Sequence, residues 1–342
     1  MYQGFYNLKD LPFRLTADPA YLYMTSRHRE ALSGLVYSIC TRPGLTVLVG
    51  EAGTGKSTLL RALIDLLERK QHPRAYFNNP MLTREEFYDL LLYKLGVECA
   101  SPLKGRQLIA LQDTLMRYRA SGRPAVLIVD EAQRLPLDLL EEIRLLLNLE
   151  TPQEKLLEII LAGQPELTEI LDRPQLRQFK QRVSAICRLQ PLELDELREY
   201  MQHRLAQAGL PNQKIFPPQT VDLIYEYTMG IPRLVNALCD TALQCGFGLQ
   251  SLEITPAILM EAAGDLDLRT DAGRAAVPVS TPSPGTEAAK VIPMPSANTD
   301  TQPTAKTVHS EPNGSDTRMP LESYSSRQKS FTFLGHLLER WR

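Results

Sequence analysis

The sequence predicts an α/β fold in which a doubly wound parallel sheet precedes a small all-α domain. Three short apolar runs are bounded by polar or turn residues: LTVLV (45–49), AVLIVD (125–130) and LLEIILAG (156–163). Such runs are typical of strands buried on both faces of a parallel sheet. Helical patterns separate them, for example at 57–70 and 136–150. This alternation predicts helices on both faces of the sheet and a ligand at the carboxyl ends of the strands.

The second half of the chain changes character twice. Only helical patterns follow from about residue 190, whereas eight of the 25 prolines lie between Pro278 and Pro320 among Ser, Thr, Ala and Gly. A segment of that composition cannot bury enough apolar surface to offset its chain entropy. We therefore expect four regions: a sheet domain with an N-terminal aromatic arm (1–189), a helical domain (190–268), a disordered linker (269–329) and a short amphipathic helix (330–342).

Composition narrows the class of protein. The formal net charge of −2 over 342 residues provides no global positive field for nucleic acid. Five cysteines without a CxxC pair indicate reduced thiols rather than a zinc or redox site. The first residues lack the pattern of a signal peptide, and no apolar stretch reaches the ~18–20 residues that span a bilayer. We expect a cytoplasmic protein, with peripheral contact at the inner face of the cytoplasmic membrane left open.

The octapeptide GEAGTGKS fits the pattern GxxxxGK[ST] and has the apolar run before it and a helical pattern after it. Glycines in such a loop let successive backbone N–H groups point at phosphates, and the following helix adds its positive end. Lys56 is expected to reach the β- and γ-phosphates and Ser57 to ligate Mg²⁺. The nucleotide-binding residues predicted here are Gly50, Glu51, Ala52, Gly53, Thr54, Gly55, Lys56, Ser57 and Thr58.

The second motif is AVLIVDE, which ends the second apolar run. Asp130 at the end of a buried strand is expected to hold Mg²⁺ with Ser57. Glu131 is placed to orient and activate a water for attack on the γ-phosphate. The alternative is that the DE pair ends a strand or caps a helix.

Five segments occur in one order: GEAGTGKS, AVLIVDEAQRL, IILAGQPEL, LRQFKQRV and GIPRLVNALCDTAL. Together with the opening 35 residues or so they resemble the AAA+ ATPases of the ExeA/GspA family, which help to assemble secretion complexes in bacterial envelopes. The resemblance covers about residues 1–265. It implies a P-loop NTPase with a three-layer αβα domain and an all-α lid, and it implies ATP and Mg²⁺ as cofactors. Similar ATPases occur in type IV pilus and exopolysaccharide loci and as transposition regulators of the TnsC kind.

The resemblance also implies two sensors of the bound nucleotide. Gln164 follows the third apolar run, where AAA+ proteins place a polar residue near the γ-phosphate. Arg233, in GIPR, falls at the start of a lid helix, the second sensor position, where an always-charged planar donor suits a phosphate. The alternatives are an amide that caps the turn before Pro165 and a surface arginine in an ion pair.

AAA+ rings complete the catalytic site with an arginine from the neighbouring subunit, which stabilises the charge of the transition state. The segment RPQLRQFKQRV carries four basic residues, Arg173, Arg177, Lys180 and Arg182. Arg182 is the first candidate for this arginine finger and Arg177 the second, against the alternative of a solvated basic helix face. The resemblance therefore implies a homo-oligomer, a ring or a filament.

Two segments outside these motifs each have more than one possible role. Six aromatic residues lie within the first 25 positions, and they either pack over the nucleotide base or anchor an extended arm on the core. His28 could touch the adenine edge, although a polar surface role is the commoner one. In the final helix Leu334, Leu337, Leu338 and Trp341 share one face. Three roles are open for that face: it docks into a groove on a protein, it lies on a membrane surface, or it has no function.

These observations predict an ATP hydrolase that drives or switches assembly of a secretion, pilus or polysaccharide export system in the cell envelope. A protein partner bound through the C-terminal tail is expected, and nucleic acid is not. The alternatives are a DNA-associated AAA+ regulator of the transposition type and a slow nucleotide-gated scaffold.

Overall fold

The structure is a computed structural model that describes residues 2–15, 21–210 and 215–268. The expected linker (269–329) and terminal helix (330–342) lie outside the described residues.

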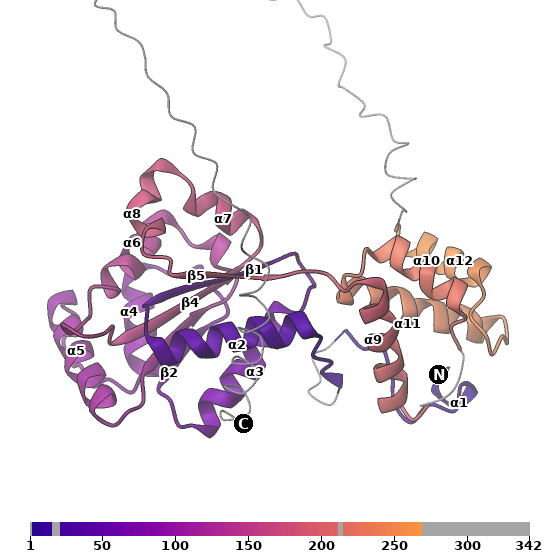
Figure 1. The fold of residues 1–342 in the computed structure, drawn as a ribbon, viewed down its shortest axis with the longest axis horizontal. Helices are drawn as coiled ribbons and strands as arrows, with labels where there is room; N and C mark the ends of the chain where they lie inside the picture. Colours follow the sequence, from indigo (N-terminus) through magenta and orange to yellow (C-terminus); the bar gives the residue numbers. More distant parts are fainter. Residues whose placement is uncertain (1, 16–20, 211–214, 269–342) are drawn as a thin grey trace, which may run out of the picture.

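Five parallel strands form the sheet, in the order β2-β3-β4-β1-β5 (Figure 1). The strands are β1 (Leu45–Gly50), β2 (Arg74–Phe77), β3 (Ala125–Val129), β4 (Leu157–Gly163) and β5 (Ala185–Leu189). In the register, Val47 of β1 lies opposite Leu161 of β4 and Ile186 of β5. The α/β prediction is confirmed, and the three apolar runs become the central strands β1, β3 and β4.

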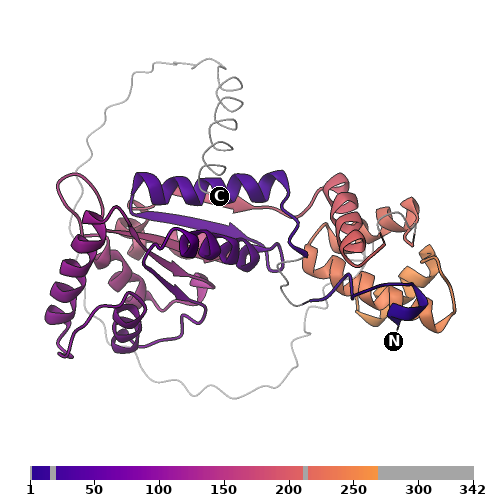
Figure 2. The ribbon, with the colours of Figure 1, turned by 90° about the horizontal axis from the view of Figure 1, so that it is seen from below.

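Helices cover both faces of this sheet, which is why its central strands are buried and, apart from Thr46 and Glu158, apolar. Alternate residues of β3 face opposite ways: Val126 and Ile128 join the core beneath α2 and α3, whereas Leu127 and Val129 join the core beneath the helices of the other face. Figure 2 shows α2 along one face. The helices and turns of this domain are α2 (Ser26–Thr41), α3 (Lys56–Arg69), α4 (Arg84–Lys94), α5 (Lys104–Ala120), η2 (Ala132–Arg134), α6 (Leu137–Leu146), α7 (Glu166–Leu171), η3 (Pro174–Leu176) and α8 (Arg177–Lys180).

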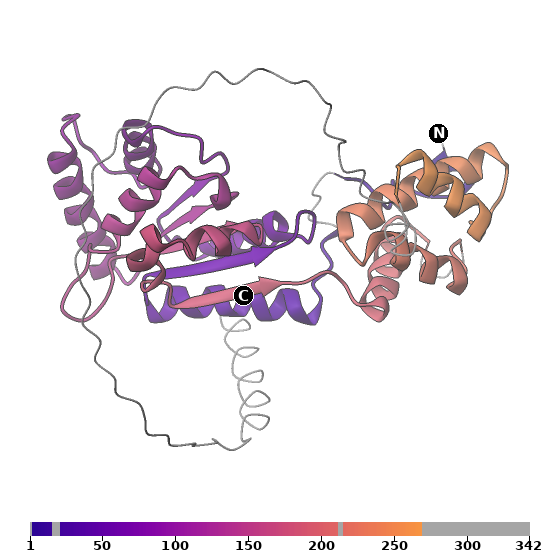
Figure 3. The ribbon, with the colours of Figure 1, turned by 90° about the horizontal axis from the view of Figure 1, so that it is seen from above.

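A second, helical unit follows β5 and lies at one end of the sheet (Figures 1 and 3). Its helices are α9 (Leu194–Gln207), α10 (Pro218–Thr228), α11 (Pro232–Gly248) and α12 (Pro256–Asp265). Proline occupies the first turn of the last three helices, where its missing N–H leaves no bond unmade.

The N-terminal arm packs on this helical unit rather than on the sheet. The short helix α1 (Tyr2–Phe5) lies beside α11, and Tyr2, Tyr6, Phe13 and Tyr21 are buried in the same cluster as α9 to α12. Tyr2, Tyr6 and Phe13 are therefore anchors, as one of the two interpretations holds, whereas Tyr21 and Tyr23 also line the cavity described below, which leaves the other interpretation open for them. The sequence analysis grouped the arm with the sheet domain (1–189). In the structure the arm packs on the helical unit instead, because its large rings are buried in the hydrophobic cluster of α9 to α12.

The junction between the two units depends on Gly230, in the turn between α10 and α11. Its φ is +71°, and a Cβ built there would lie 2.0 Å from the carbonyl oxygen of Leu192, whose N–H donates to the Gly230 carbonyl at 2.9 Å. We expect Gly230→Ala to lower the free energy of unfolding by more than about 2 kcal/mol, because the strain falls on backbone that cannot move aside. Gly264→Ala is the matched control. Its Cβ meets nothing within 4 Å in α12, so it should stabilise by roughly 0.5–1 kcal/mol. Equal urea midpoints for the two variants would contradict this account of the junction.

A carboxyl group, Glu158, is buried at the start of β4 with 1% of its surface exposed. The Gly44 N–H donates to its Oε2 at 2.8 Å and the Thr46 hydroxyl to its Oε1 at 3.4 Å. Burial nevertheless raises the pKa of Glu158 from 4.5 to about 8. The folded pKa lies above the unfolded one. The contribution of Glu158 to the free energy of unfolding therefore falls as the pH rises from 4.5 to 8.

Glu158→Gln should therefore be more stable than the wild type at pH 9, by on the order of a few kcal/mol, and should differ little at pH 5. Thermal unfolding across this range measures the gap. A gap that does not change with pH would show that Glu158 keeps an ordinary pKa.

Candidate nucleotide-binding site

A cavity of about 710 Å³ lies where the carboxyl ends of the strands meet the helical unit and the arm. The sheet domain contributes the loop 52–58, Glu131 and Gln164, whereas the helical unit contributes Arg204, Arg233 and Asn236. Crevices at this edge of a parallel sheet are the usual ligand sites of α/β folds. The structure thus brings most of the predicted site residues to one cavity.

The loop after β1 turns sharply at two glycines. Gly53 has φ +84° and Gly55 has φ +100°, and Gly55 is the residue before the first turn of α3. A Cβ on Gly50, where the strand ends, would lie 2.6 Å from the Leu189 carbonyl oxygen. The Thr54 hydroxyl closes the loop by donating to the Glu51 carbonyl at 2.8 Å. Backbone of this shape, leading into a helix N-terminus, forms a concave site for anions.

Lys56 brings a buried cation to this loop. Its side chain is 5% exposed, and its Nζ donates to the carbonyls of Gly50 at 2.6 Å and Glu51 at 2.9 Å. Burial lowers the pKa of Lys56, while the carboxylates of Glu131 and Asp130 oppose that shift. No carboxylate of the described residues forms an ion pair with Lys56, so the charge is available to an anion in the cavity.

Ser57 lines the cavity and contacts Asp130, a buried residue that lies behind it. The Ser57 hydroxyl donates to Asp130 Oδ2 at 2.9 Å, and the Glu131 N–H donates to Asp130 Oδ1 at 2.9 Å. Across the described ranges no cluster of three or more His, Cys, Asp or Glu could hold a metal ion by itself. Mg²⁺, however, is commonly held by one or two carboxylates together with substrate phosphates and waters. A hydroxyl and a carboxylate in contact beside a phosphate-binding loop fit that oxygen donor set.

Glu131 occupies a conformation that is rare for a residue with a Cβ, with φ +54°. Its Oε2 accepts from Gln133 Nε2 at 2.7 Å and lies 4.0 Å from the Arg134 Nε. Gln133 in turn accepts, at Oε1, from the Gln164 N–H at 3.2 Å. Strained backbone persists only where the surroundings hold it, and it clusters at functional sites. Gln133 therefore connects the Glu131 carboxylate with the strand end that carries Gln164.

Arg233 stands in the first turn of α11 against the loop. Its N–H donates to the Gly53 carbonyl at 3.3 Å, and a Cβ on Gly53 would lie 2.7 Å from Arg233 Cβ. The contact places an exposed guanidinium on the cavity wall, and Asn236 lines the same wall one helical turn later.

His28 is buried rather than a polar surface residue, so that part of the prediction is wrong. Its Nδ1 lies 2.8 Å from the Thr25 hydroxyl and its Nε2 lies 3.3 Å from the Thr54 carbonyl, and burial lowers the pKa of the ring. The neutral imidazole contacts the phosphate-binding loop and lines the cavity beside it, where a bound nucleotide could meet it.

Sequence reasoning missed Arg204, a 6% exposed arginine of α9 that lines the cavity. Its Nε donates to the Pro12 carbonyl at 2.5 Å and its Nη1 to the Tyr200 hydroxyl at 2.8 Å. The guanidinium carbon lies 5.1 Å from the Tyr21 ring centroid and 5.4 Å from that of Tyr200. Arg204 therefore holds the arm against α9 beside the cavity. Its partner in the arm, Pro12, is 192 positions away in the sequence, and only the Tyr200–Arg204 helical spacing could have hinted at this contact.

The predicted finger residues Arg177 and Arg182 lie outside the cavity. Both are exposed, as are Arg173 and Lys180, and they belong to α8 or the turns beside it. Arg182 precedes the amino end of β5, whereas the cavity lies at the carboxyl ends of the strands. Neither arginine lines the cavity of its own chain.

Comparison with known proteins agrees with this geometry. Residues 40–171 match the family described as AAA domain. The chain is 39% identical over 278 residues to general secretion pathway protein A of Aeromonas hydrophila, a match that covers 80% of this chain and 50% of that protein. The chain is an ExeA/GspA-like AAA+ protein. It spans half the length of that relative.

Solved structures share the fold of this AAA+ protein at low identity. The ORC2 protein of Aeropyrum pernix, in ADPNP and ADP complexes, matches with a TM-score of 0.55 at 17% identity over 75% of this chain and 72% of that one. Drosophila ORC bound to DNA matches with a TM-score of 0.60 at 18% identity, over 78% and 66%. Among the helices that the structure describes, none is long and apolar enough to cross a membrane.

Proposed function

We propose that this chain binds Mg·ATP in the 710 Å³ cavity and hydrolyses it. One observation carries the proposal: Glu131 and Ser57, the hydrogen-bond partner of the buried Asp130, line the same cavity as the phosphate-binding loop with its buried Lys56. Few uses other than phosphate chemistry need a cation, a hydroxyl–carboxylate pair and a second carboxylate around one anion cradle.

The residues act in distinct roles. Backbone N–H groups of the loop 50–58 hold the phosphates, and Lys56 leaves the loop carbonyls to contact the β- and γ-phosphates. Ser57 and Asp130 would hold Mg²⁺, which offsets phosphate charge when it is bound. Glu131, oriented by Gln133, accepts a proton from the attacking water.

Gln164, after the end of β4, and Arg233, in the helical unit, respond to whether the γ-phosphate is present. Gln164 and Arg233 line the cavity from the sheet domain and from the helical unit, respectively. A phosphate contacted by both draws the two units together, and its departure lets them separate. Movement of the helical unit relative to the sheet domain then becomes the output of the cycle.

A second copy of the chain completes the site in this proposal. Because Arg177 and Arg182 are exposed and away from their own cavity, either could reach the cavity of a neighbour in a ring or filament. We expect Glu131→Gln and Arg182→Ala each to lower turnover by about 10²-fold or more when assayed alone. In an equimolar mixture, an intact cavity faces an intact arginine at about a quarter of the interfaces, and those interfaces should recover activity. Steady-state turnover of the mixture measures this. If Arg182→Ala keeps its turnover alone, while Arg177→Ala loses turnover and recovers it when mixed with Glu131→Gln, Arg177 is the finger.

The cellular role follows the relative. Likeness to general secretion pathway protein A supports a cytoplasmic ATPase, with peripheral contact at the membrane, that drives or switches assembly of an envelope secretion, pilus or polysaccharide export system. The formal net charge of −2 gives no support to nucleic acid as the partner.

A further inference from the structure

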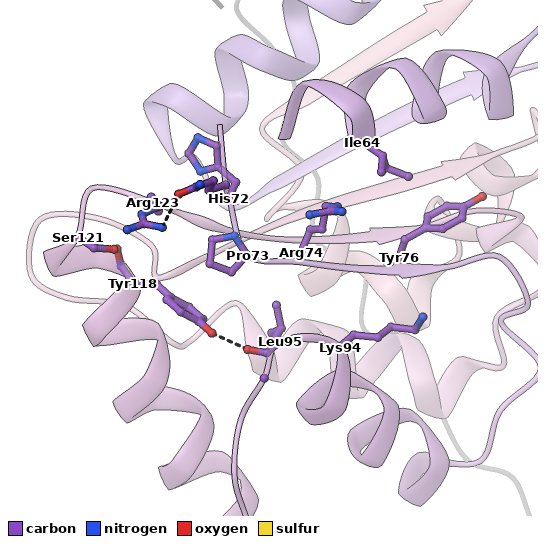
Figure 4. A pocket seen from close by; sticks show the side chains of 12 residues that line it. Ile64, His72, Pro73, Arg74, Tyr76, Lys94, Leu95, Tyr118, Ser121 and Arg123 are labelled. Atoms are coloured by element: carbon purple, nitrogen blue, oxygen red, sulfur yellow. Dashed lines mark hydrogen bonds between the residues drawn. The ribbon is translucent and has the colours of Figure 1, made fainter. Parts of the chain in front are cut away.

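A second cavity, of about 750 Å³, runs along the free edge of the sheet (Figure 4). It shares no lining residue with the nucleotide cavity. Its floor is the segment from Gln71 to Tyr76, which leads into and forms the edge strand β2. We call it the edge groove.

The floor of the edge groove offers backbone groups that the sheet does not use. The Val126 N–H donates to the Pro73 carbonyl at 2.9 Å and the Asp130 N–H to the Phe77 carbonyl at 2.8 Å, so odd-numbered residues of β2 turn their backbone toward β3. Strand alternation then directs the N–H and C=O of Arg74 and Tyr76 to the open side. In the described ranges β2 pairs with β3 alone. These groups match the ladder that an added strand needs.

The walls of the groove come from helices of both sheet faces. Ile64 of α3 forms one wall, and Leu95 and Tyr118, at the ends of α4 and α5, form the other (Figure 4). The Tyr118 hydroxyl donates to the Leu95 carbonyl at 2.7 Å and fixes the second wall. Apolar walls on either side of a free strand edge suit the alternating side chains of an extended peptide.

The charged residues of the groove favour a negatively charged ligand. The lining contains Arg74, Lys94 and Arg123 and no carboxylate. Arg74 bonds Glu68, which lies outside the lining, whereas Lys94 lies over the Phe77 ring at 5.9 Å and Arg123 donates to the Gln71 amide at 3.3 Å. Neither Lys94 nor Arg123 forms an ion pair within the described residues, so both are free to meet an anion.

We propose that the edge groove binds an extended acidic segment of a partner protein by strand addition to β2. The peptide's backbone pairs with Arg74 and Tyr76, and its acidic side chains meet Lys94 and Arg123. A nucleic acid could meet the cations but offers no ladder of N–H and C=O groups to the strand edge, which is why a peptide is favoured.

The test uses the full chain without nucleotide, so that it stands apart from the proposed hydrolysis. The probe is a fluorescein-labelled pool of peptides of about six residues, with Glu or Asp at alternate positions and Val, Ile or Thr between them. Binding is followed by anisotropy. The groove variant is Lys94→Glu with Arg123→Glu. The control is Arg106→Glu, which is exposed at the far end of α5, about 18 Å from Tyr118 along the helix.

We expect at least one member of the pool to bind with a Kd below about 1 mM, the groove variant to weaken binding about tenfold or more, and the control to bind as the wild type does. N-methylation of alternate peptide nitrogens should weaken binding to a similar extent, because it blocks the ladder while leaving the charges. The absence of binding across the pool, or binding that neither change affects, overturns the proposal. A DNA duplex that displaces the peptide and binds more tightly, with loss on charge reversal, also overturns it and assigns the groove to nucleic acid.

Discussion

Glu131→Gln is expected to lower ATP turnover by about 10²- to 10⁴-fold while nucleotide affinity stays within about threefold of the wild type. Glutamine keeps the shape of the side chain and its capacity to accept from Gln133, which lies 2.7 Å away, but it cannot take a proton from water. Turnover is measured by phosphate release, and affinity by titration with a fluorescent ATP analogue.

The matched control for this change is Glu85→Gln, an exposed carboxylate in the first turn of α4. It should leave both quantities unaltered. If Glu131→Gln turned over ATP at the wild-type rate, another group would have to be the base. Loss of nucleotide affinity in this variant would instead assign Glu131 a binding role.

Lys56→Ala should weaken nucleotide affinity by about 10- to 150-fold, the size of a charged hydrogen bond to phosphate, and turnover should fall with it. The side chain is 5% exposed, its hydrogen-bond partners are the carbonyls of Gly50 and Glu51, and none of the described carboxylates forms an ion pair with it. The melting temperature of the variant without nucleotide should therefore stay close to that of the wild type.

Lys70→Ala, which removes an exposed lysine after the end of α3, is the control for Lys56→Ala and should bind nucleotide normally. Isothermal titration with ATP and Mg²⁺ compares the two. Unchanged affinity in Lys56→Ala would mean that the loop does not bind the phosphates in the way that its geometry indicates.

The central strands of the fold could be predicted because their burial on both faces leaves continuous apolar runs. The edge strands could not. In β2, Arg74 and Tyr76 alternate with Ala75 and Phe77 over only four residues, and in β5 most positions are exposed. Such strands carry little apolar signal, and their pairing with β3 or β1 decides their structure.

The residues of the candidate site also fall into those that the sequence could predict and those that it could not. Residues contiguous in the sequence, from Gly50 to Thr58 and at Asp130 and Glu131, were found because phosphate binding needs a fixed local pattern. Gln133 and Arg204 were missed because their partners come from other elements. The arm was assigned to the wrong unit for a similar reason, since aromatic residues indicate burial but not the surface that buries them.

Turnover of Mg·ATP by the full chain across a protein concentration series tests the central claim most directly. The account predicts Mg²⁺-dependent hydrolysis whose rate per subunit rises with concentration, because the cavity needs an arginine from a second copy. A chain that binds ATP but shows no turnover at any concentration would contradict the claim that this site hydrolyses it.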